Sequence, residues 1–233
     1  MVGFLKSVAG AQNSLANVGT SGAGDDRARV VDAGFAPDPG SPYTTTFDMT
    51  TLDYEAGDLL IAVIIAESFY DATDTTITTS GWSEIFRFSS SGGGAVFTRI
   101  ADGSETNVIA TETRSGGVFV VALRGFDTPT KAEHVLESAS SGRNLTIPAM
   151  TDTDFDVFLH VFYQSGASVA IMPTAEIPGR FEGKVFASGS FAVNSPIAGV
   201  FFSPDAGNAY AARNRGGNNG SLRLIRCGLN RSA

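Results

Sequence analysis

Three aspartates occupy alternate positions at Asp152, Asp154 and Asp156. Alternate residues of an extended strand point to one side, so the three carboxylates would share a face and repel one another. A bound Ca²⁺ would relieve this repulsion, because the ion prefers carboxylate oxygens. The run is not an EF-hand loop, since Val157 stands where the sharp-turn glycine belongs. The pattern indicates either a calcium site or, more simply, a solvated acidic strand edge that resists aggregation.

Residues that could serve as nucleophiles, bases or metal ligands are few. The sequence has no Gly-x-Ser-x-Gly elbow, no phosphate-binding loop and no zinc-ligand spacing. Of its two histidines, His160 lies in an apolar run and is interpreted as a structurally satisfied residue, and His134 as a surface residue. A glycosidase needs two carboxylates across a cleft, and the sequence brings no two together. The carboxylates available for such a pair are Glu84, Glu105, Glu112 and Glu182. We predict a protein that is not an enzyme and has no cofactor other than the Ca²⁺ considered above.

Aromatic side chains offer a second kind of site, because a carbohydrate-binding module stacks sugars on exposed rings. Trp82, Tyr70 and Tyr210 could take this role. Trp82, however, follows a glycine at the start of an expected strand, and it is interpreted as a core anchor. A carbohydrate-binding or receptor-binding module that recognises a host surface glycan is therefore the alternative hypothesis.

The elements that must position these residues are β-strands. Short runs of β-branched and aromatic residues alternate with Gly, Ser, Asn and Pro, which is typical of antiparallel strands joined by turns. The runs recur in a similar order and spacing in the two parts of the chain. This predicts an all-β sandwich over residues 28–233, with two related halves of about 28–136 and 137–233, after an N-terminal arm of residues 1–27. The runs are 57–65, 81–87, 95–100 and 118–125, then 155–163, 177–181, 198–202 and 222–228.

Three of the expected strands carry apolar residues at both alternating sets of positions, namely 59–66, 118–123 and 157–163. A strand of an antiparallel sheet with one wet face should alternate apolar and polar residues. Continuous apolarity indicates that both faces are covered, either because the strand is central in the fold or because another chain covers it. We interpret it as favouring an oligomer that buries the outer sheet, with long loops over that face as the alternative.

The charge is low and unevenly distributed. Charged residues make up 17% of the chain and the net charge is −8, which argues against nucleic acid as a partner. Residues 206–233 carry five arginines and no acidic residue, so residues 1–205 carry −13 (−8 − 5). Such a chain could attract copies of itself head to tail, or neutralise its own charge internally. The assembly candidates are Phe4 and Leu5 of the arm, with Arg213, Arg215, Arg223, Arg226 and Arg231.

Cellular location is constrained by three further features. Cys227 is the one cysteine, so no intrachain disulfide can form and the thiol is expected to pack as a small apolar group. Residues 1–7 begin like a signal peptide but lack its sustained apolar stretch. No run is long enough for a membrane-spanning helix. We expect synthesis in the cytoplasm without a signal peptide, and no membrane partner.

Four short runs resemble a module of bacteriophage virion proteins and some bacterial surface proteins. They are Gly57-Asp58-Leu59-Leu60, Ser80-Gly81-Trp82, Arg99-Ile100-Ala101-Asp102-Gly103 and Ala122-Leu123-Arg124-Gly125. The resemblance covers about residues 28–136, and the second half lacks the Gly-Asp and Ser-Gly-Trp units. It implies a jelly-roll-like sandwich in a head decoration, head fibre or tail-associated protein. No catalytic residue set belongs to the module, so none is carried over.

These observations lead to one expectation about function. The chain is expected to be a non-enzymatic bacteriophage virion protein, made in the host cytoplasm and located in the virion. Its expected partners are copies of itself, in a trimer or another cyclic oligomer, and other virion proteins. Apolar burial at subunit contacts would supply the affinity, and unlike charges would set the orientation.

Overall fold

The computed structural model describes residues 28–66, 75–88, 94–111, 113, 116–139, 144–147, 154–165, 172–173, 182–187, 197–203, 210–213 and 220–232. These residues form sixteen β-strands and one short 3-10 turn, η1 (Met49–Thr51), without an α-helix. Every strand pairing in this part of the chain is antiparallel. The prediction of an all-β, antiparallel β-sandwich is confirmed. The predicted arm, residues 1–27, lies outside the described residues.

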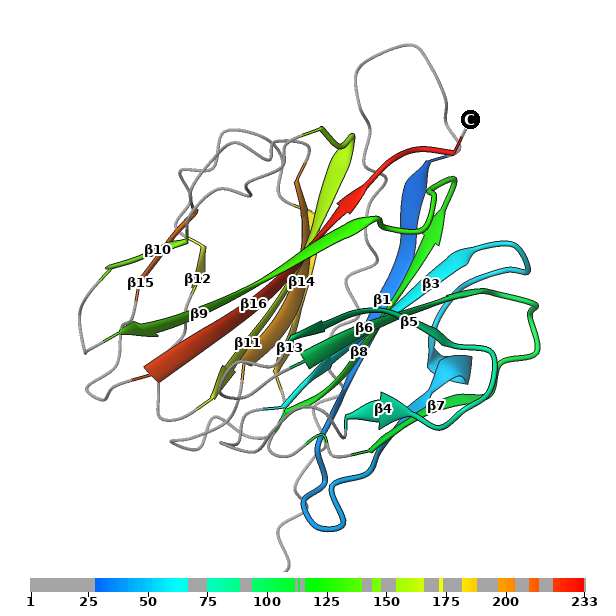
Figure 1. Ribbon diagram of the computed structural model, residues 1–233, viewed down its shortest axis with the longest axis horizontal. Coiled ribbons are helices and arrows are strands. Elements are labelled where there is room, and N and C mark those ends of the chain that lie inside the picture. The colour runs from blue at the N-terminus through cyan, green and yellow to red at the C-terminus, as the bar shows by residue number, and fades with distance from the viewer. Residues whose placement is uncertain are drawn as a thin grey trace, which may run out of the picture.

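The first half of the chain builds two sheets (Figure 1). The larger sheet has five strands in the order β1-β8-β3-β6-β5, and the smaller has three in the order β2-β7-β4. The strands are β1 (Arg29–Pro37), β2 (Thr45–Asp48), β3 (Leu59–Ile65), β4 (Thr76–Ile77), β5 (Ser83–Phe88), β6 (Gly94–Ile100), β7 (Asn107–Thr111) and β8 (Gly117–Arg124).

The second half repeats this plan strand for strand. Its sheets have the orders β9-β16-β11-β14-β13 and β10-β15-β12, so β9 takes the place of β1, β10 that of β2, and so on to β16. The strands are β9 (Lys131–Ala139), β10 (Asn144–Ile147), β11 (Val157–Ser165), β12 (Met172–Pro173), β13 (Glu182–Ala187), β14 (Ile197–Ser203), β15 (Tyr210–Arg213) and β16 (Gly220–Leu229).

The connectivity adds two details to the sequence-based expectations. A jelly roll would place the fifth strand of each half beside the fourth, whereas β5 pairs with β6 and β13 pairs with β14. The strand order is therefore jelly-roll-like except at this strand. The chain passes from the sheets of the first half to those of the second half between β8 and β9, because β9 pairs with β16 of the second half. This places the change between Arg124 and Lys131.

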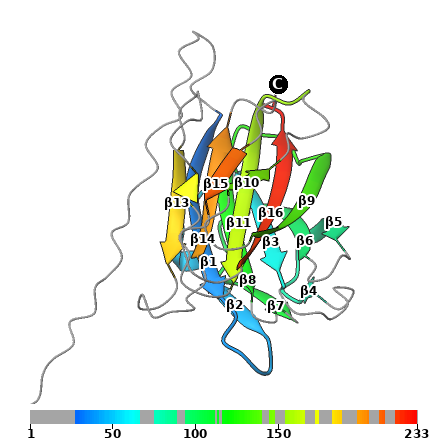
Figure 2. The same cartoon turned by 90° about the vertical axis from the view of Figure 1, so that its left-hand side faces the viewer.

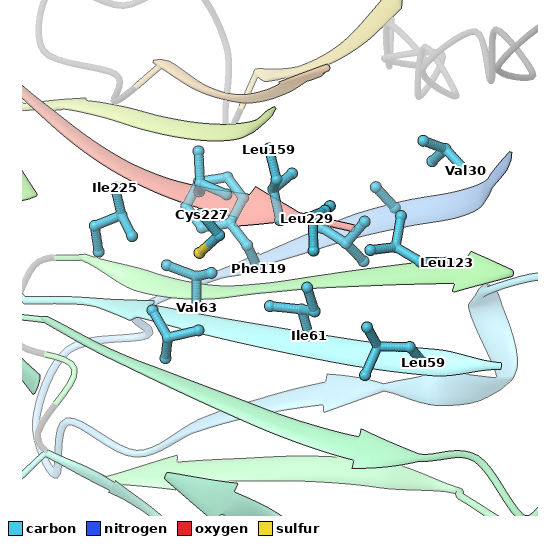
Figure 3. Packing of buried hydrophobic residues seen from close by; sticks show 14 of the residues in the cluster. Val30, Leu59, Ile61, Val63, Phe119, Leu123, Leu159, Ile225, Cys227 and Leu229 are labelled. Carbon is cyan, nitrogen blue, oxygen red and sulfur yellow. The ribbon is translucent and has the colours of Figure 1, made fainter. Parts of the chain in front are cut away.

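The four sheets stack as four layers, with the two five-stranded sheets in the middle (Figures 1 and 2). Side chains from both halves meet between the middle sheets and form what we call the inner cluster (Figure 3). A second set, the outer cluster, lies between the two sheets of the first half. The inner cluster includes Leu59, Ile61, Val63, Phe119 and Leu123 from the first half and Leu159, Ile225, Cys227 and Leu229 from the second. The outer cluster includes Phe47, Met49, Leu60, Ala62, Ile64, Phe97, Val108, Val118 and Val120.

This layering explains why some strands are apolar at every position. All seven residues of β3 are buried. Leu59 and Ile61 face the inner cluster, and Leu60 and Ala62 face the outer cluster. Each buried Leu or Ile contributes on the order of 1.5–3 kcal/mol to folding. The interpretation that double apolarity favours burial against another chain is therefore corrected for β3 and β8, since both of their faces are covered within the chain. Assembly has to be argued from other features.

The last residues of the chain close the connection between the halves. The amide of Ser232 donates to the carbonyl of Gly125 (2.9 Å), and the amide of Asp127 donates to the carbonyl of Asn230 (2.9 Å). The Ser232 hydroxyl also donates to Asp127 Oδ1 at 2.8 Å. The segment after β16 is thereby held along the segment that joins β8 to β9.

Candidate functional site

The Gly-Asp-Leu-Leu and Ala-Leu-Arg-Gly runs meet in a partly buried ion pair. Arg124 Nε lies 2.7 Å from Asp58 Oδ1, and Arg124 Nη2 lies 2.8 Å from Asp58 Oδ2. The amide of Glu55 donates to Asp58 Oδ2 at 2.8 Å, so the carboxylate also holds the turn before β3. Burial opposes ionisation of Asp58, but the hydrogen bonds from Arg124 and Glu55 and the charge of Arg124 outweigh it, and the pKa of this carboxyl falls below its ordinary value.

The other two runs of the resemblance meet around Arg99. Its Nε lies 2.8 Å from Glu105 Oε1, and its Nη2 lies 2.6 Å from Asp102 Oδ2. Its Nη1 donates to the carbonyl of Ser80 at 2.9 Å. Gly81 follows with φ of 89°, and a Cβ there would come within 2.6 Å of the guanidinium, so this turn requires glycine. Arg99 thereby braces the Ser-Gly-Trp turn against the end of β6.

These two ion-paired groups are joined into one unit, which we call the motif cluster. The amide of Ala101 donates to the carbonyl of Asp58 at 2.8 Å, and the Tyr54 hydroxyl donates to the carbonyl of Glu105 at 2.9 Å. Burial and the nearby Glu105 carboxylate raise the pKa of Tyr54. The motif cluster consists of Tyr54, Asp58, Arg99, Glu105 and Arg124.

The chemistry available in the motif cluster is that of fixed charges. Burial opposes ionisation of Glu105, but hydrogen bonds from backbone amides and the charge of Arg99 lower its pKa below the ordinary value. The pKa of Arg124 is raised, chiefly by its hydrogen bonds to Asp58. Both carboxylates are therefore anions at neutral pH and bound to cations, which suits a structural brace and not a proton donor.

A second polar group lies on the outer face of the five-stranded sheet of the second half. Arg226 of β16 pairs in register with His160 of β11 on one side and with Glu133 of β9 on the other. Arg226 Nη2 lies 2.8 Å from Glu133 Oε2, with side-chain exposures of 2% and 17%. Burial, helped by the charge of Arg226, lowers the pKa of His160 to about 3, so the imidazole is neutral at pH 7. We call Glu133, Arg226 and His160 the charged row.

The predicted calcium residues are only partly within the described residues. Asp152 lies outside them. Asp154 and Asp156 are exposed and precede β11, so they do not sit in an extended strand as expected. Asp156 Oδ2 accepts a hydrogen bond from the amide of Arg231 at 2.9 Å. No group of three or more His, Cys, Asp or Glu side chains suited to a metal ion occurs in the part of the chain that the structure describes.

Some of the predicted assembly residues lie within the described residues and others lie outside them. Phe4, Leu5 and Arg215 lie outside the described residues. Arg213 and Arg223 fall in β15 and β16. Arg226 was expected to be a contact residue, but its side chain is buried and paired with Glu133, so it is not available to a partner. Arg231 pairs with Phe126 in an isolated bridge, which places it against the connection between the halves.

The remaining candidates mostly have structural roles. Trp82 is half-buried and packs against the outer cluster, as its interpretation as a core anchor expects. His134 was interpreted as a surface residue, but it is half-buried and its ring lies 5.4 Å from that of Phe88. Glu84 forms an ion pair with Arg87 of the same strand. Tyr70 and Glu112 lie outside the described residues, and Tyr210 and Glu182 fall in β15 and β13.

Comparison of the chain with family models, with curated proteins and with solved structures finds no match. Within the described residues there is no helix of the length and apolarity needed to cross a membrane.

Replacing Asp58 by asparagine is expected to lower the free energy of unfolding at pH 7 and to flatten its decline in acid. The pKa of Asp58 is lower in the folded chain than its unfolded value of about 3.9. Its contribution to stability is therefore present above that value and is lost as the pH falls through the folded pKa. Urea unfolding between about pH 7 and pH 2 measures both effects.

Asp53 provides the matched control for this experiment. It is exposed and acts on Arg124 through its charge. Asp53→Asn should leave the acid decline of the parent protein nearly intact. Equal behaviour of the two variants would show that the contact between Asp58 and Arg124 does not stabilise the fold.

Proposed function

We propose that the chain is a non-enzymatic structural protein of a bacteriophage virion, in a capsid decoration, head-fibre or tail-associated position. One observation carries the proposal. Three of the four runs that resemble the virion module supply Asp58, Arg99 and Arg124 of the motif cluster, and the fourth accepts a hydrogen bond from Arg99 through the Ser80 carbonyl. The resemblance therefore rests on residues that brace one end of the sandwich, and these residues would be shared by proteins built in the same way.

The architecture supports a structural role for the chain in an assembled particle. Two apolar clusters hold the stacked sheets together, and the charges of the motif cluster are fixed by ion pairs. Residues 1–27 precede β1. The first residue of β1, Arg29, pairs in register with Arg124. The arm therefore joins the body at the same end as the motif cluster. We propose that contacts of this arm with a copy of the chain or with another virion protein drive assembly into a trimer or another cyclic oligomer.

The proposal is tested by asking whether the protein travels with phage particles. Particles produced by a bacterium that carries the coding sequence are banded on a density gradient and analysed by mass spectrometry. The protein is expected to band with intact particles and to stay with them after a high-salt wash. Recovery only at the top of the gradient would overturn the proposal.

A chain without residues 1–27 provides the second arm of the test. Because the sequence predicts that the sandwich spans residues 28–233, this variant is expected to give the same urea transition as the full chain. It is expected to be missing from the banded particles and to be smaller than the full chain on gel filtration. Normal incorporation of the variant would contradict assembly through the arm.

A further inference from the structure

The five-stranded sheet of the second half has two faces of different character. Its inner face carries Leu159, Ile225 and Cys227, which belong to the inner cluster. Its outer face carries the charged row, which crosses β9, β16 and β11 at one level. Arg226 is almost fully buried there, so the row is part of the interior of the second half and not a solvated surface.

The first half has an apolar row at the matching position. Ala62 is the fourth residue of β3, as His160 is the fourth residue of β11. Ala62 pairs with Val120, and Val120 pairs with Gly34, so these three correspond to the charged row. The ring of Phe47 lies over this position, because a Cβ on Gly34 would come within 2.4 Å of it. At this position along the strands, the first half therefore carries an apolar row and the second half carries the charged row.

A chain made of two such repeats faces a packing ambiguity. Both faces of the first half's five-stranded sheet are apolar, so it could pack on any other apolar sheet. The competing partners are the outer face of the second half's sheet and the sheets of another copy, and such misassembly is typical of repeated domains. The correct structure requires that the outer face of the second half's five-stranded sheet be unsuitable for packing against the first half's sheet.

We infer that the charged row determines which face of the second half's five-stranded sheet packs on the first half. Arg226 and Glu133 are already largely covered in the folded chain, so an apolar sheet on the outer face would have to replace that cover and would offer the two charges no hydrogen bonds, which is costly. The inner face carries no such penalty. Because a buried ion pair often adds little stability compared with apolar side chains of similar volume, its presence is better explained by a choice between packings than by stability alone.

The test replaces the row by apolar residues and uses the native thiol as the reporter. The variant is Glu133→Leu/Arg226→Met/His160→Leu. Cys227 is the one cysteine of the chain, is fully buried in the inner cluster, and has a pKa raised by burial to about 12. In the correct packing it should therefore react slowly with a thiol reagent. Parent and variant are unfolded in urea, refolded at several protein concentrations, labelled, and analysed by gel filtration.

The variant is expected to keep a cooperative urea transition but to refold into a mixture. A fast-labelling fraction of Cys227 and additional species on gel filtration should appear, and both should grow with protein concentration. The ratio of correct to wrong packing is expected to fall by on the order of 100-fold. The control Phe158→Leu/Leu224→Met changes apolar residues of the same outer face and keeps the charges, so it should refold like the parent.

Two results would overturn the inference. The first is a variant that refolds with the parent's labelling rate and gel-filtration profile, since the charges would then not select the packing. The second is a variant without a cooperative urea transition, which would show that the charged row is needed for stability itself. A control that misassembles as much as the variant would show that the outer face tolerates no change of any kind, and would also count against the inference.

Discussion

Replacing Glu133 by alanine is expected to lower the free energy of unfolding by about 3–5 kcal/mol. The change removes the carboxylate that lies 2.8 Å from Arg226 Nη2, so the guanidinium, which is 2% exposed, loses this charged partner. The nearby His160 is neutral and cannot replace the lost charge. Urea unfolding at pH 7, followed by circular dichroism, gives the difference from the parent protein.

Glu84→Ala is the matched control, because it also removes a glutamate from an ion pair with an arginine. Glu84 and Arg87 are 36% and 25% exposed, so water and salt screen their interaction. The expected loss is about 1 kcal/mol or less. Glu133→Gln should fall between the two, because it keeps a hydrogen-bond acceptor but not the charge. Similar losses for Glu133→Ala and Glu84→Ala would contradict the burial of the charged row.

Phe119→Ala is expected to cost about 3–5 kcal/mol and to destabilise both halves together. Phe119 is fully buried in the inner cluster, and its ring centroid lies 4.4 Å from that of Phe35. Because the inner cluster contains side chains of both halves, loss of this ring weakens the contact between them. We expect one shifted transition, seen alike by circular dichroism and by the exposure of Cys227 to a thiol reagent.

Ile100→Ala is the control for this experiment, since Ile100 is a large apolar residue that is 58% exposed. Its loss should change the free energy of unfolding by about 0.5 kcal/mol or less. Two separate transitions in Phe119→Ala, with the thiol of the second half protected through the first of them, would show that the halves unfold independently. That result would contradict the inner cluster as a shared core.

The fold class and the repetition could be predicted because both are written in local patterns. The apolar run 57–65 contains β3, and its counterpart 155–163 contains the first seven residues of β11; these strands hold equivalent places in the two five-stranded sheets. Turn-forming residues separate the runs in both halves. Such signals depend on neighbours in the sequence, so they are visible without knowing which strands pair.

The layering could not be predicted, because it depends on which faces meet. The continuous apolarity of residues 59–66 correctly indicated that both faces are covered. It could not indicate that one cover is the second half of the same chain, and a partner subunit was inferred instead. A hydrophobic pattern indicates that a face is buried, but it does not indicate which molecule covers that face.

The residues of the site were visible in part. Asp58 and Arg124 stood out in two short runs, but they are 66 residues apart and nothing in their spacing indicates that they pair. His160 was correctly interpreted as a structural residue from its apolar neighbours. Arg226 is predicted from the sequence to be an assembly residue, although its place between Ile225 and Cys227 in an apolar run is a signal of the burial that the structure shows.

The inner cluster combines two distant parts of the chain, so it cannot form until both parts have been synthesised. The first half is complete when Arg124 has been made, but its covering residues extend to Leu229. At about 5–20 residues per second, the remaining 105 residues (229 − 124) take roughly 5–20 s to emerge from the ribosome. Throughout that interval the apolar inner face of the first half's five-stranded sheet lacks its cover. Yield in a heterologous host should therefore depend strongly on chaperones that shield nascent chains.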